Sequence, residues 1–285
     1  MKLYKTKGSA FLEHVDKYYR IQGGWDELIN RENLFSYLQL QTTQSDELSS
    51  GDIQILEKDL QAPIGNQEVW AAGVTYLRSR EARMEESKKS GAADFYDKVY
   101  EAERPELFFK ANPQRVSGPG QDLYIRKDSS WNVPEPELAL FVNASAKILG
   151  YTIANDMSSR SIEGENPLYL PQAKCYEKSA GLGPCLYVPE HAIDPAARIE
   201  MTIFRDRKSV YHDSVSINRM KRSHTGLVEY LFRECDFPFG VFLMTGTCLV
   251  PANDFTLQPG DRVAISIEGI GVLTNNIAFN PAKRG

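Results

Sequence analysis

A strand–turn–strand pattern in the middle of the chain constrains the fold more than any other feature of the sequence. Two apolar runs, at 138–142 and 148–154, flank the short polar segment 143–147, which is typical of a hairpin turn. If the turn is centred near the middle of that segment, Asp156 lies opposite Glu135 on the neighbouring strand. The pattern therefore predicts an antiparallel hairpin with acidic residues at its open end.

The acidic residues at this open end have the spacing of a cation site. Glu135 and Glu137 are two positions apart, so their side chains point to the same face of a strand. Together with Asp156 they offer three hard oxygen ligands, which suit Mg²⁺, Mn²⁺ or Ca²⁺ better than zinc. The alternative is a solvated acidic strand end, the usual environment of glutamate and aspartate.

The composition is that of an ordinary globular protein. With 285 residues, 42% of them hydrophobic and 25% charged, the chain can bury a full core in one or two domains. The net charge of −5 gives no electrostatic basis for binding nucleic acid or an anionic membrane. No apolar run approaches the ~18 residues of a membrane-spanning helix, and the N-terminus lacks the apolar core of a secretion signal.

The cysteines point to a reducing compartment. None of the four forms a C-x-x-C pair, and most have apolar neighbours in the sequence, at positions 175, 185, 235 and 248. We therefore expect reduced thiols in the core of a cytoplasmic protein.

Residues 1–65 are expected to form a small N-terminal domain, with a larger domain over 66–285. The first segment contains short apolar patterns typical of strands and one helical pattern, at 3–4, 10–15, 18–21 and 25–38. Segments rich in glycine and serine or proline end it, at 50–51 and 62–66. No residue of this segment indicates chemistry, which favours a packing or oligomerisation module.

A buried strand at 69–75 opens the larger domain, and a strongly charged stretch, 77–103, follows it. That stretch is typical of one or two surface helices. It is either a solvated helix pair or a mobile lid over a pocket, since it directly follows a core strand.

Beyond residue 105 the pattern is mainly that of β-strands. Strands are predicted at 107–110, 137–142, 148–154, 185–188, 198–205, 209–215, 240–244, 262–268 and 271–277. One clear helix is predicted, at 223–235. Many strands with few helices favour a β-rich α+β fold, a mixed β-sandwich or roll. The phosphate-binding patterns G-x-G-x-x-G and Walker A do not occur in the sequence, which disfavours nucleotide binding.

Several motifs follow one another in the order of a known family. They are Pro134-Glu-Pro-Glu137, Gly150-Tyr-Thr-Ile-Ala-Asn-Asp156, Ser158-Ser-Arg160, Lys174, Gly183-Pro184, Met244-Thr-Gly-Thr247, Leu257-Gln-Pro-Gly-Asp261 and Ile267-Glu-Gly-Ile-Gly271. Over residues 66–285 the chain thereby resembles the fumarylacetoacetate hydrolase superfamily. The resemblance implies that family's β-sandwich or roll, with a small N-terminal domain. It also implies a divalent metal, Mg²⁺ or else Mn²⁺ or Ca²⁺, held by Glu135, Glu137 and Asp156 with Lys174 beside it.

One departure from the family pattern bears on the reaction. The hydrolases of the superfamily place a water-activating histidine shortly after an Asn-Tyr pair. Here the matching stretch is Thr75-Tyr-Leu-Arg-Ser-Arg80, with Ser79 where the histidine would stand. Serine and arginine cannot replace a base with a pKa near 6.5. Hydrolytic cleavage of a carbon–carbon bond is therefore disfavoured.

The stretch 155–174 is similar to one branch of the superfamily, which dehydrates a small 2-oxo sugar acid. The resemblance implies a hydro-lyase that converts 2-dehydro-3-deoxy-D-arabinonate to 2-oxoglutarate semialdehyde through a metal-stabilised enolate. D-Xylonate leads to the same substrate, because forming the 2-oxo-3-deoxy acid removes both stereocentres at which the two sugar acids differ. In that branch a glutamate precedes a Phe-Phe-Lys strand, and Glu106 occupies the matching position. We expect Glu106 to be the base at C3; the alternative is a charged residue at the rim.

Further residues receive roles by the same route. Lys174 is expected to neutralise the enolate or orient the substrate carboxylate, in preference to forming a Schiff base. Arg160 either binds a substrate carboxylate or makes a structural ion pair. Glu163 is expected to contact substrate hydroxyls or outer-shell waters, and Thr247 to hydrogen-bond the substrate carboxylate.

Other readings keep the fold and change the chemistry. An acylpyruvate hydrolase, a 2-oxo acid decarboxylase and a keto–enol isomerase would all begin from the same chelated 2-oxo acid. A non-enzymatic domain stabilised by metal is a further alternative. The resemblance also implies a homodimer or homotetramer.

Overall fold

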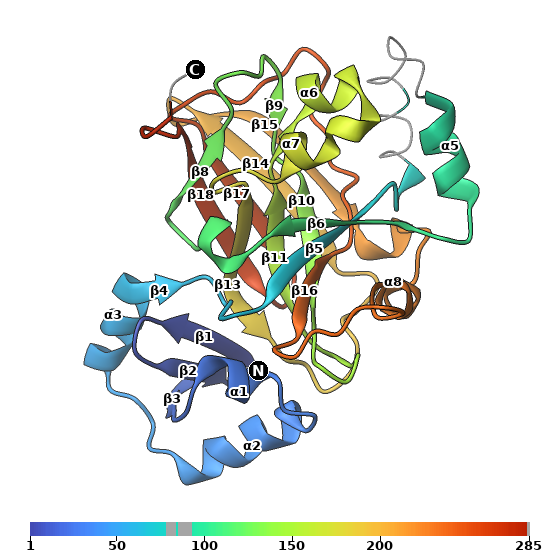
Figure 1. Cartoon of the computed structure of the whole chain (residues 1–285). Helices are drawn as coiled ribbons and strands as arrows, with labels where there is room; N and C mark the ends of the chain where they lie inside the picture. Colours follow the sequence, from blue (N-terminus) through green and yellow to red (C-terminus); the bar gives the residue numbers. More distant parts are fainter. Residues whose placement is uncertain (78–83, 85–92, 284–285) are drawn as a thin grey trace.

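The computed structural model describes residues 1–77, 84 and 93–283 (Figure 1). Among these residues, two large β-sheets form the body of the molecule. The first has 11 strands, in the order β3-β2-β1-β13-β11-β10-β16-β5-β6, with β4 beside β1 and β7 beside β13. Its strands are β1 (Lys2–Thr6), β2 (Ala10–His14), β3 (Lys17–Ile21), β4 (Leu60–Gln61), β5 (Glu68–Gly73), β6 (Glu106–Ala111), β7 (Val116–Ser117), β10 (Pro136–Val142), β11 (Ile148–Asp156), β13 (Ala180–Tyr187) and β16 (Val241–Met244).

The second sheet has five strands and packs against one face of the first. Its order is β15-β14-β17-β18-β8. The strands are β8 (Asp122–Ile125), β14 (Arg198–Arg205), β15 (Lys208–Ser216), β17 (Arg262–Ile267) and β18 (Gly271–Phe279). A short pair, β9 (Asn132–Val133) and β12 (Ser158–Ser159), lies beside them. This β-rich arrangement with few helices confirms the predicted fold class.

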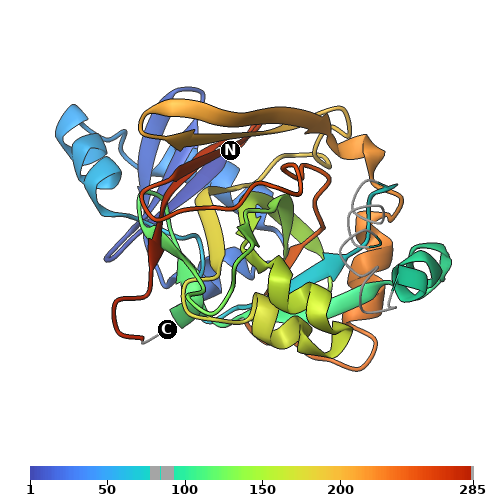
Figure 2. The same ribbon diagram turned by 90° about the horizontal axis from the view of Figure 1, so that it is seen from above.

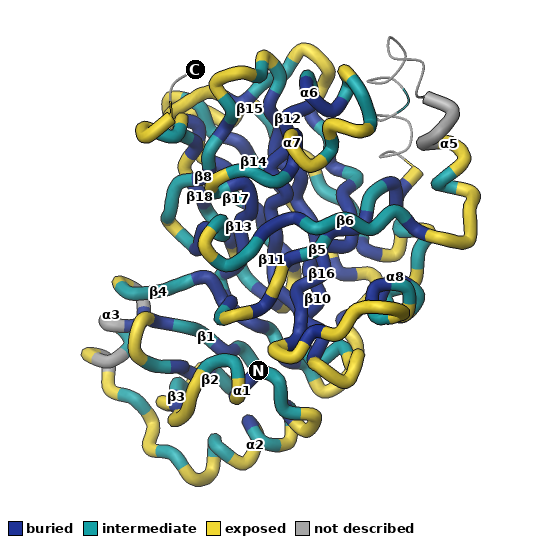
Figure 3. Tube along the Cα trace, viewed as in Figure 1, coloured by how far each residue is buried: buried dark blue, intermediate teal, exposed yellow. Residues whose placement is uncertain are grey.

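The central hairpin is buried on both faces. Leu138 and Leu140 pack in one core cluster with Met201 of the five-stranded sheet. Ala139 and Phe141 point the other way, into a second cluster that includes residues of the N-terminal segment. Because β10 has neighbours on both faces, its apolar residues form a continuous run instead of alternating with polar ones. Buried tube fills the middle of the molecule in Figure 3.

The N-terminal segment joins the large sheet through the pairing of β1 with β13. Its helices are α1 (Trp25–Ile29), α2 (Leu34–Gln44) and α3 (Ser50–Asp59). The prediction of a single helix at 25–38 is wrong, because the helix is interrupted between Ile29, where α1 ends, and Leu34, where α2 begins. At that break Asn30 donates from its side chain to Pro238 O and accepts from Ala144 N, which anchors the turn to the larger part of the molecule. The domain boundary near residue 65 stays a prediction.

The remaining helices lie around the large sheet. They are α5 (Ala93–Glu101), α6 (Arg160–Glu165), α7 (Leu170–Lys174) and α8 (His224–Leu231), with short 3₁₀ turns η1 (Pro113–Arg115), η2 (Pro167–Tyr169) and η3 (Ile217–Arg219). In Figure 1, α6 and α7 lie at the end of the molecule opposite the N-terminal strands; Figure 2 shows the same helices from above, on the side away from β14 and β15. None of the described helices is long and apolar enough to cross a membrane.

Most predicted strands are found within two residues of their predicted ends, and β14 matches at both ends. The predicted strand 185–188 is too short, because β13 begins at Ala180. Its first half contains Gly181, where a Cβ would come within 3.2–3.3 Å of Asn275, Asn155 and Leu123. Close packing against the neighbouring sheet thus requires glycine at this position. Because glycine adds nothing to the apolar pattern from which strands are predicted, the first half of β13 does not stand out in the sequence.

Two other predictions meet the structure differently. Helix α8 is shorter than the predicted 223–235; Ser223 caps it by accepting from Gly226 N, and it ends at Leu231. Residue 235 is an exposed cysteine, so the expectation that all four thiols lie in the core is wrong, although all four are free. Helix α5 confirms a helix within 77–103. The segments 78–83 and 85–92, which include Ser79 and most of the predicted lid, lie outside the described residues.

Candidate active site

The hairpin has the predicted register. Pro136 pairs with Asn155 and Glu137 with Ala154. The backbone N–H of Asp156 donates to Glu135 O at 2.9 Å, so these two residues are opposite each other at the open end. A turn at the other end sets this register: Ala146 N donates to Asn143 O, and Ala146 adopts a φ of 59°.

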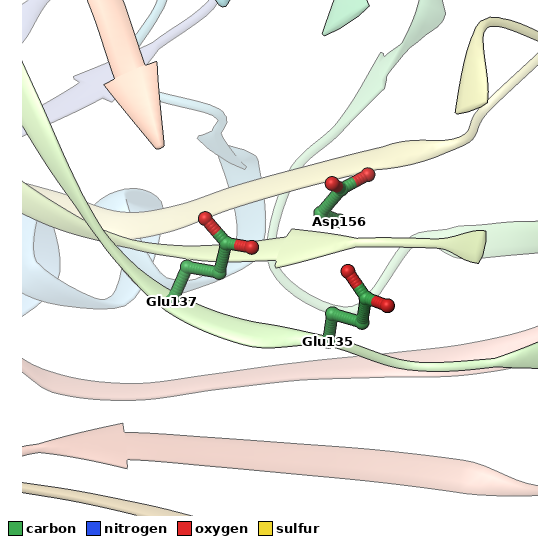
Figure 4. Close-up of side chains that lie close together, drawn as sticks. All are labelled: Glu135, Glu137 and Asp156. Carbon is green, nitrogen blue, oxygen red and sulfur yellow. The ribbon is translucent and has the colours of Figure 1, made fainter. Parts of the chain in front are cut away.

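The three acidic side chains converge. Glu135, Glu137 and Asp156 each offer one carboxylate oxygen, and these oxygens lie within 4.8 Å of one another (Figure 4). All three residues are at most 3% exposed. This burial rules out the alternative of a solvated acidic strand end. Burying three carboxylates together is costly unless cations compensate them.

The loop after β16 holds Glu137. Gly246 N donates to Glu137 Oε2 at 2.6 Å. Gly246 has a φ of +97°, and a Cβ there would lie 2.0 Å from Thr75 Oγ1, so the position requires glycine. Thr75 Oγ1 in turn donates to Thr245 O at 2.7 Å. Burial, and then the charges of Asp156 and Glu135, raise the pKa of Glu137 well above its ordinary value.

Lys174 lies within the acidic cluster. Its side chain is fully buried at the end of α7. The ammonium donates to Glu135 Oε2 at 2.7 Å and to Asp156 Oδ2 at 2.9 Å, and it also contacts the hydroxyl of Ser158. The structure thus brings Lys174 to the carboxylates as expected, and the two carboxylates favour its charged form over the neutral amine that a Schiff base needs.

A second buried lysine was not predicted. Lys110 Nζ lies 2.5 Å from Asp156 Oδ1, and the Lys110 side chain is fully buried. Burial lowers the pKa of Lys110, while the charge of Asp156 acts in the opposite direction. The signal available in the sequence was the two-residue period of β6, which puts Glu106, Phe108 and Lys110 on one face of the strand.

Glu106 lies beside the pocket that opens onto the carboxylates. In the β5–β6 pair it is opposite Gly73, and a Cβ on Gly73 would come within 1.9 Å of Glu106 Oε2. Gly73 is part of the pocket wall, together with Phe108 and Thr247. The Glu106 carboxylate therefore reaches the edge of the pocket, where the lack of a side chain at residue 73 leaves it room.

The predicted substrate contacts occupy different surroundings. Arg160 and Thr247 line the pocket. One nitrogen of the Arg160 guanidinium lies 3.1 Å from Glu135 Oε1, which is the structural ion pair given above as the alternative. The guanidinium also lies over the ring of Trp131, 5.7 Å from its centroid. Thr247 Oγ1 accepts from Leu249 N at 3.3 Å.

Glu163 is buried on α6 and is not part of the described pocket wall. Two polar residues, Glu165 and Asn166, follow it closely in the sequence, and Glu165 is exposed. Asn166 instead caps the 3₁₀ turn η2, because its side chain accepts from Leu168 N. Glu163 therefore does not itself line the pocket as Arg160 and Thr247 do.

Comparison with known proteins places this site in a family. The model of the fumarylacetoacetate (FAA) hydrolase C-terminal domain matches residues 69–278. A probable 2-keto-3-deoxyxylonate dehydratase of Haloferax volcanii is 48% identical over 79% of this chain and 77% of that relative. A 2-dehydro-3-deoxy-D-arabinonate dehydratase of Saccharolobus solfataricus is 39% identical over 84% of each chain.

A solved structure of 2-keto-3-deoxy-D-arabinonate dehydratase, complexed with magnesium and 2,5-dioxopentanoate, superposes with a TM-score of 0.85. It is 33% identical, and the match covers 98% of this chain and 99% of that one. The match of the family model covers the five-stranded sheet, the part of the large sheet from β5 onward and every acidic residue of the cluster. The chain therefore belongs to the fumarylacetoacetate hydrolase family.

Proposed function

We propose that the protein is a metal-dependent hydro-lyase that converts 2-dehydro-3-deoxy-D-arabinonate, the acid also formed from D-xylonate, to 2,5-dioxopentanoate and water. The name 2,5-dioxopentanoate is the systematic name of 2-oxoglutarate semialdehyde. The observation that carries the proposal is the buried cluster of three carboxylates with Lys174 among them and Glu106 at the pocket edge. The names of the two related dehydratases support it, as does the compound bound in the related structure.

The residues present fit a divalent cation. Three carboxylate oxygens within 4.8 Å, all buried, form a hard-oxygen donor set of the kind that Mg²⁺ prefers. Glu135, Glu137 and Asp156 would hold it; Mn²⁺ and Ca²⁺ share the ligand preference. When bound, such an ion draws electron density from a 2-oxo acid and so acidifies the protons at C3.

Glu106 is proposed as the base that removes a proton from C3 of the substrate. A carboxylate suffices for this step once the proton is acidified, so no histidine is required. The bond between C4 and its hydroxyl then breaks, and the hydroxyl leaves as water after taking up a proton. Loss of a proton from C5 and return of a proton to C3 give an enol, which becomes the aldehyde when C4 gains a proton and the hydroxyl on C5 loses one.

The cationic and polar residues of the pocket would orient the substrate. Lys174 is proposed to stabilise the negative charge that develops on the 2-oxo oxygen, because its ammonium is already directed into the cluster. Arg160 and Thr247, which line the pocket, are proposed to bind the substrate carboxylate. Glu163 is proposed to act on substrate hydroxyls through water, from its buried position on α6.

The decisive experiment supplies 2-dehydro-3-deoxy-D-arabinonate and Mg²⁺ and follows the semialdehyde with a coupled dehydrogenase. We expect turnover that disappears with a chelator and returns with Mg²⁺. An acylpyruvate serves as the competing substrate. Cleavage of the acylpyruvate without formation of the semialdehyde would replace the dehydratase with a hydrolase of the same family.

The assembly and compartment are also proposed. Copies of the chain are expected to form a homodimer or homotetramer in the cytoplasm, where the four free thiols would stay reduced. Sedimentation analysis of the purified protein tests the assembly. A monomer at micromolar concentration would contradict it.

A further inference from the structure

The contacts of Lys110 give this lysine a defined task within the acidic cluster. Its ammonium lies 2.5 Å from Asp156 Oδ1 and donates to Met157 O at 2.9 Å and to Lys174 O at 2.6 Å. A lysine ammonium has three N–H donors, and here three acceptors surround it. The side chain is 0% exposed, so no contact with bulk water competes with these three.

These contacts give the two oxygens of Asp156 different partners. Oδ1 is paired with Lys110 and Oδ2 with Lys174, which also contacts Glu135. The contact with Lys110 is an ion pair between two buried side chains, where electrostatic attraction is little screened by water. The ring of Tyr176 contributes to that environment, with its centroid 5.9 Å from Lys110 Nζ. Oδ1 is therefore occupied by Lys110, and Oδ2, which Lys174 joins to Glu135, is the oxygen that Asp156 can offer to a cation.

The number of oxygens that a carboxylate offers discriminates between cations. Ca²⁺ takes 6–8 oxygen ligands at about 2.3–2.6 Å and often uses both oxygens of one carboxylate. Mg²⁺ requires a near-octahedral shell at about 2.0–2.1 Å and takes one oxygen from each carboxylate.

We propose that Lys110 is a positioning residue that keeps Asp156 a one-oxygen ligand and thereby favours Mg²⁺ and Mn²⁺ over Ca²⁺. The inference rests on the metal site of the proposed function. A purely structural role is the competing explanation, because Lys110 also ties β6 to the ends of β11 and α7 through Met157 and Lys174. The two explanations differ in what they predict for the ratio of two metal affinities.

The test is calorimetric titration of Mg²⁺ and of Ca²⁺, without substrate, into the wild type and Lys110→Met. Loss of a partner of a metal ligand typically weakens metal binding about 10- to 100-fold. We expect such a loss for Mg²⁺ and a clearly smaller one for Ca²⁺, so that the ratio of Mg²⁺ to Ca²⁺ affinity falls at least about fivefold. Equal losses for both ions, or no loss, would overturn the proposal.

Lys5→Met is the matched control. It also removes one positive charge from a partly buried lysine, which contacts Ile64 O in the N-terminal segment, and it should leave both metal affinities unchanged. If the wild type binds neither ion, the proposed metal site itself fails. If the wild type binds Mg²⁺ and dehydrates its substrate while the ratio in Lys110→Met is unchanged, only the role of Lys110 fails.

A second measurement needs no variant and applies even if Lys110→Met does not fold. Infrared difference spectra of wild-type protein with ¹³C-labelled aspartate carboxylates distinguish one-oxygen from two-oxygen coordination by the separation of the carboxylate stretching bands. Addition of Ca²⁺, which otherwise often takes both oxygens of a carboxylate, should still produce the one-oxygen pattern at Asp156. A two-oxygen pattern would contradict the assignment of Lys110.

Discussion

The carboxylate of Glu106 lies directly over Gly73, its partner on the neighbouring strand. A Cβ at residue 73 would come within 1.9 Å of Glu106 Oε2 and 2.5 Å of the carboxyl carbon. This arrangement places the proposed base at the wall of the pocket, because Gly73 lines the pocket and the side chain of Glu106 extends over Gly73. The absence of a side chain at one position thus fixes where another side chain can lie.

Gly73→Ala should therefore displace Glu106 without touching the carboxylate cluster. General-base catalysis contributes about 10²–10⁴ in rate, so a displaced base should lower kcat by about 100-fold. The affinity for Mg²⁺, measured by calorimetry, should stay within about twofold, because the atoms nearest to a Cβ at residue 73 belong to Glu106 and not to a proposed ligand. Gly8→Ala is the matched control, since a Cβ at Gly8 meets nothing within 4 Å. Full activity in Gly73→Ala would separate Glu106 from the proton transfer.

Glu106→Gln tests the same residue by its chemistry. The amide keeps the shape of the side chain and cannot accept a proton, so turnover should fall by at least about 10²-fold with metal affinity near normal. In D₂O the wild type should return 2,5-dioxopentanoate with deuterium at C3, because C3 loses and regains a proton. Exchange at C3 of recovered substrate should be lost in Glu106→Gln. Undiminished exchange in the variant would assign the base to another residue.

Glu137→Gln tests the carboxylate cluster. Glu137 is one of three groups that share a small volume, and its Oε2 also accepts from Gly246 N. Glutamine retains an oxygen for that bond, so the protein should fold, but it loses the charge that a divalent cation requires. In Glu137→Gln we expect no metal-dependent turnover and no rise in Tm on adding Mg²⁺. The wild type should show metal-dependent turnover and a higher Tm with Mg²⁺.

The far-ultraviolet circular dichroism of Glu137→Gln should match that of the wild type, which separates loss of metal binding from loss of fold. Wild-type turnover in this variant would remove Glu137 from the site.

The sequence was sufficient for the hairpin and its acidic end, and insufficient for what surrounds them. The register could be predicted because a short polar segment between two apolar runs fixes where the turn is centred, and the centre of the turn sets which residues pair. The positions of Glu135 and Asp156 follow from that pairing. Local pattern therefore determined the part of the site that is built from two adjacent strands.

Lys110 could not be found in the same way. A lysine near the end of a strand ordinarily extends into solvent, and its burial here depends on Asp156, Met157 and Lys174, which are distant in sequence. The first half of β13 was missed for a related reason: Gly181 is needed for close contact with other strands and carries no hydrophobic signal of its own. The two-residue period of β6 gives the face on which Lys110 lies, but the burial of Lys110 and the close packing at Gly181 depend on long-range contacts that a local pattern does not show.

His224 should make the protein sensitive to mild acid. The residue opens helix α8, its ring lies 6.4 Å from that of Tyr151, and burial lowers its pKa below the ordinary value of 6.5. The unfolded chain therefore binds a proton at a higher pH than the folded protein does. This contribution to the free energy of unfolding is fully present above pH 6.5 and is lost as the pH falls toward the pKa of the folded state.

Replacing His224 with glutamine removes the titrating group, so the free energy of unfolding should fall less between pH 7.5 and pH 5.5 in His224→Gln than in the wild type. Urea denaturation of both proteins at the two pH values, with a chelator present, measures the difference. Between pH 7.5 and pH 8.5 the two proteins should change in parallel, because His224 is neutral in both states there; this interval is the internal control. An equal loss of stability in both proteins on acidification would show that other groups govern it.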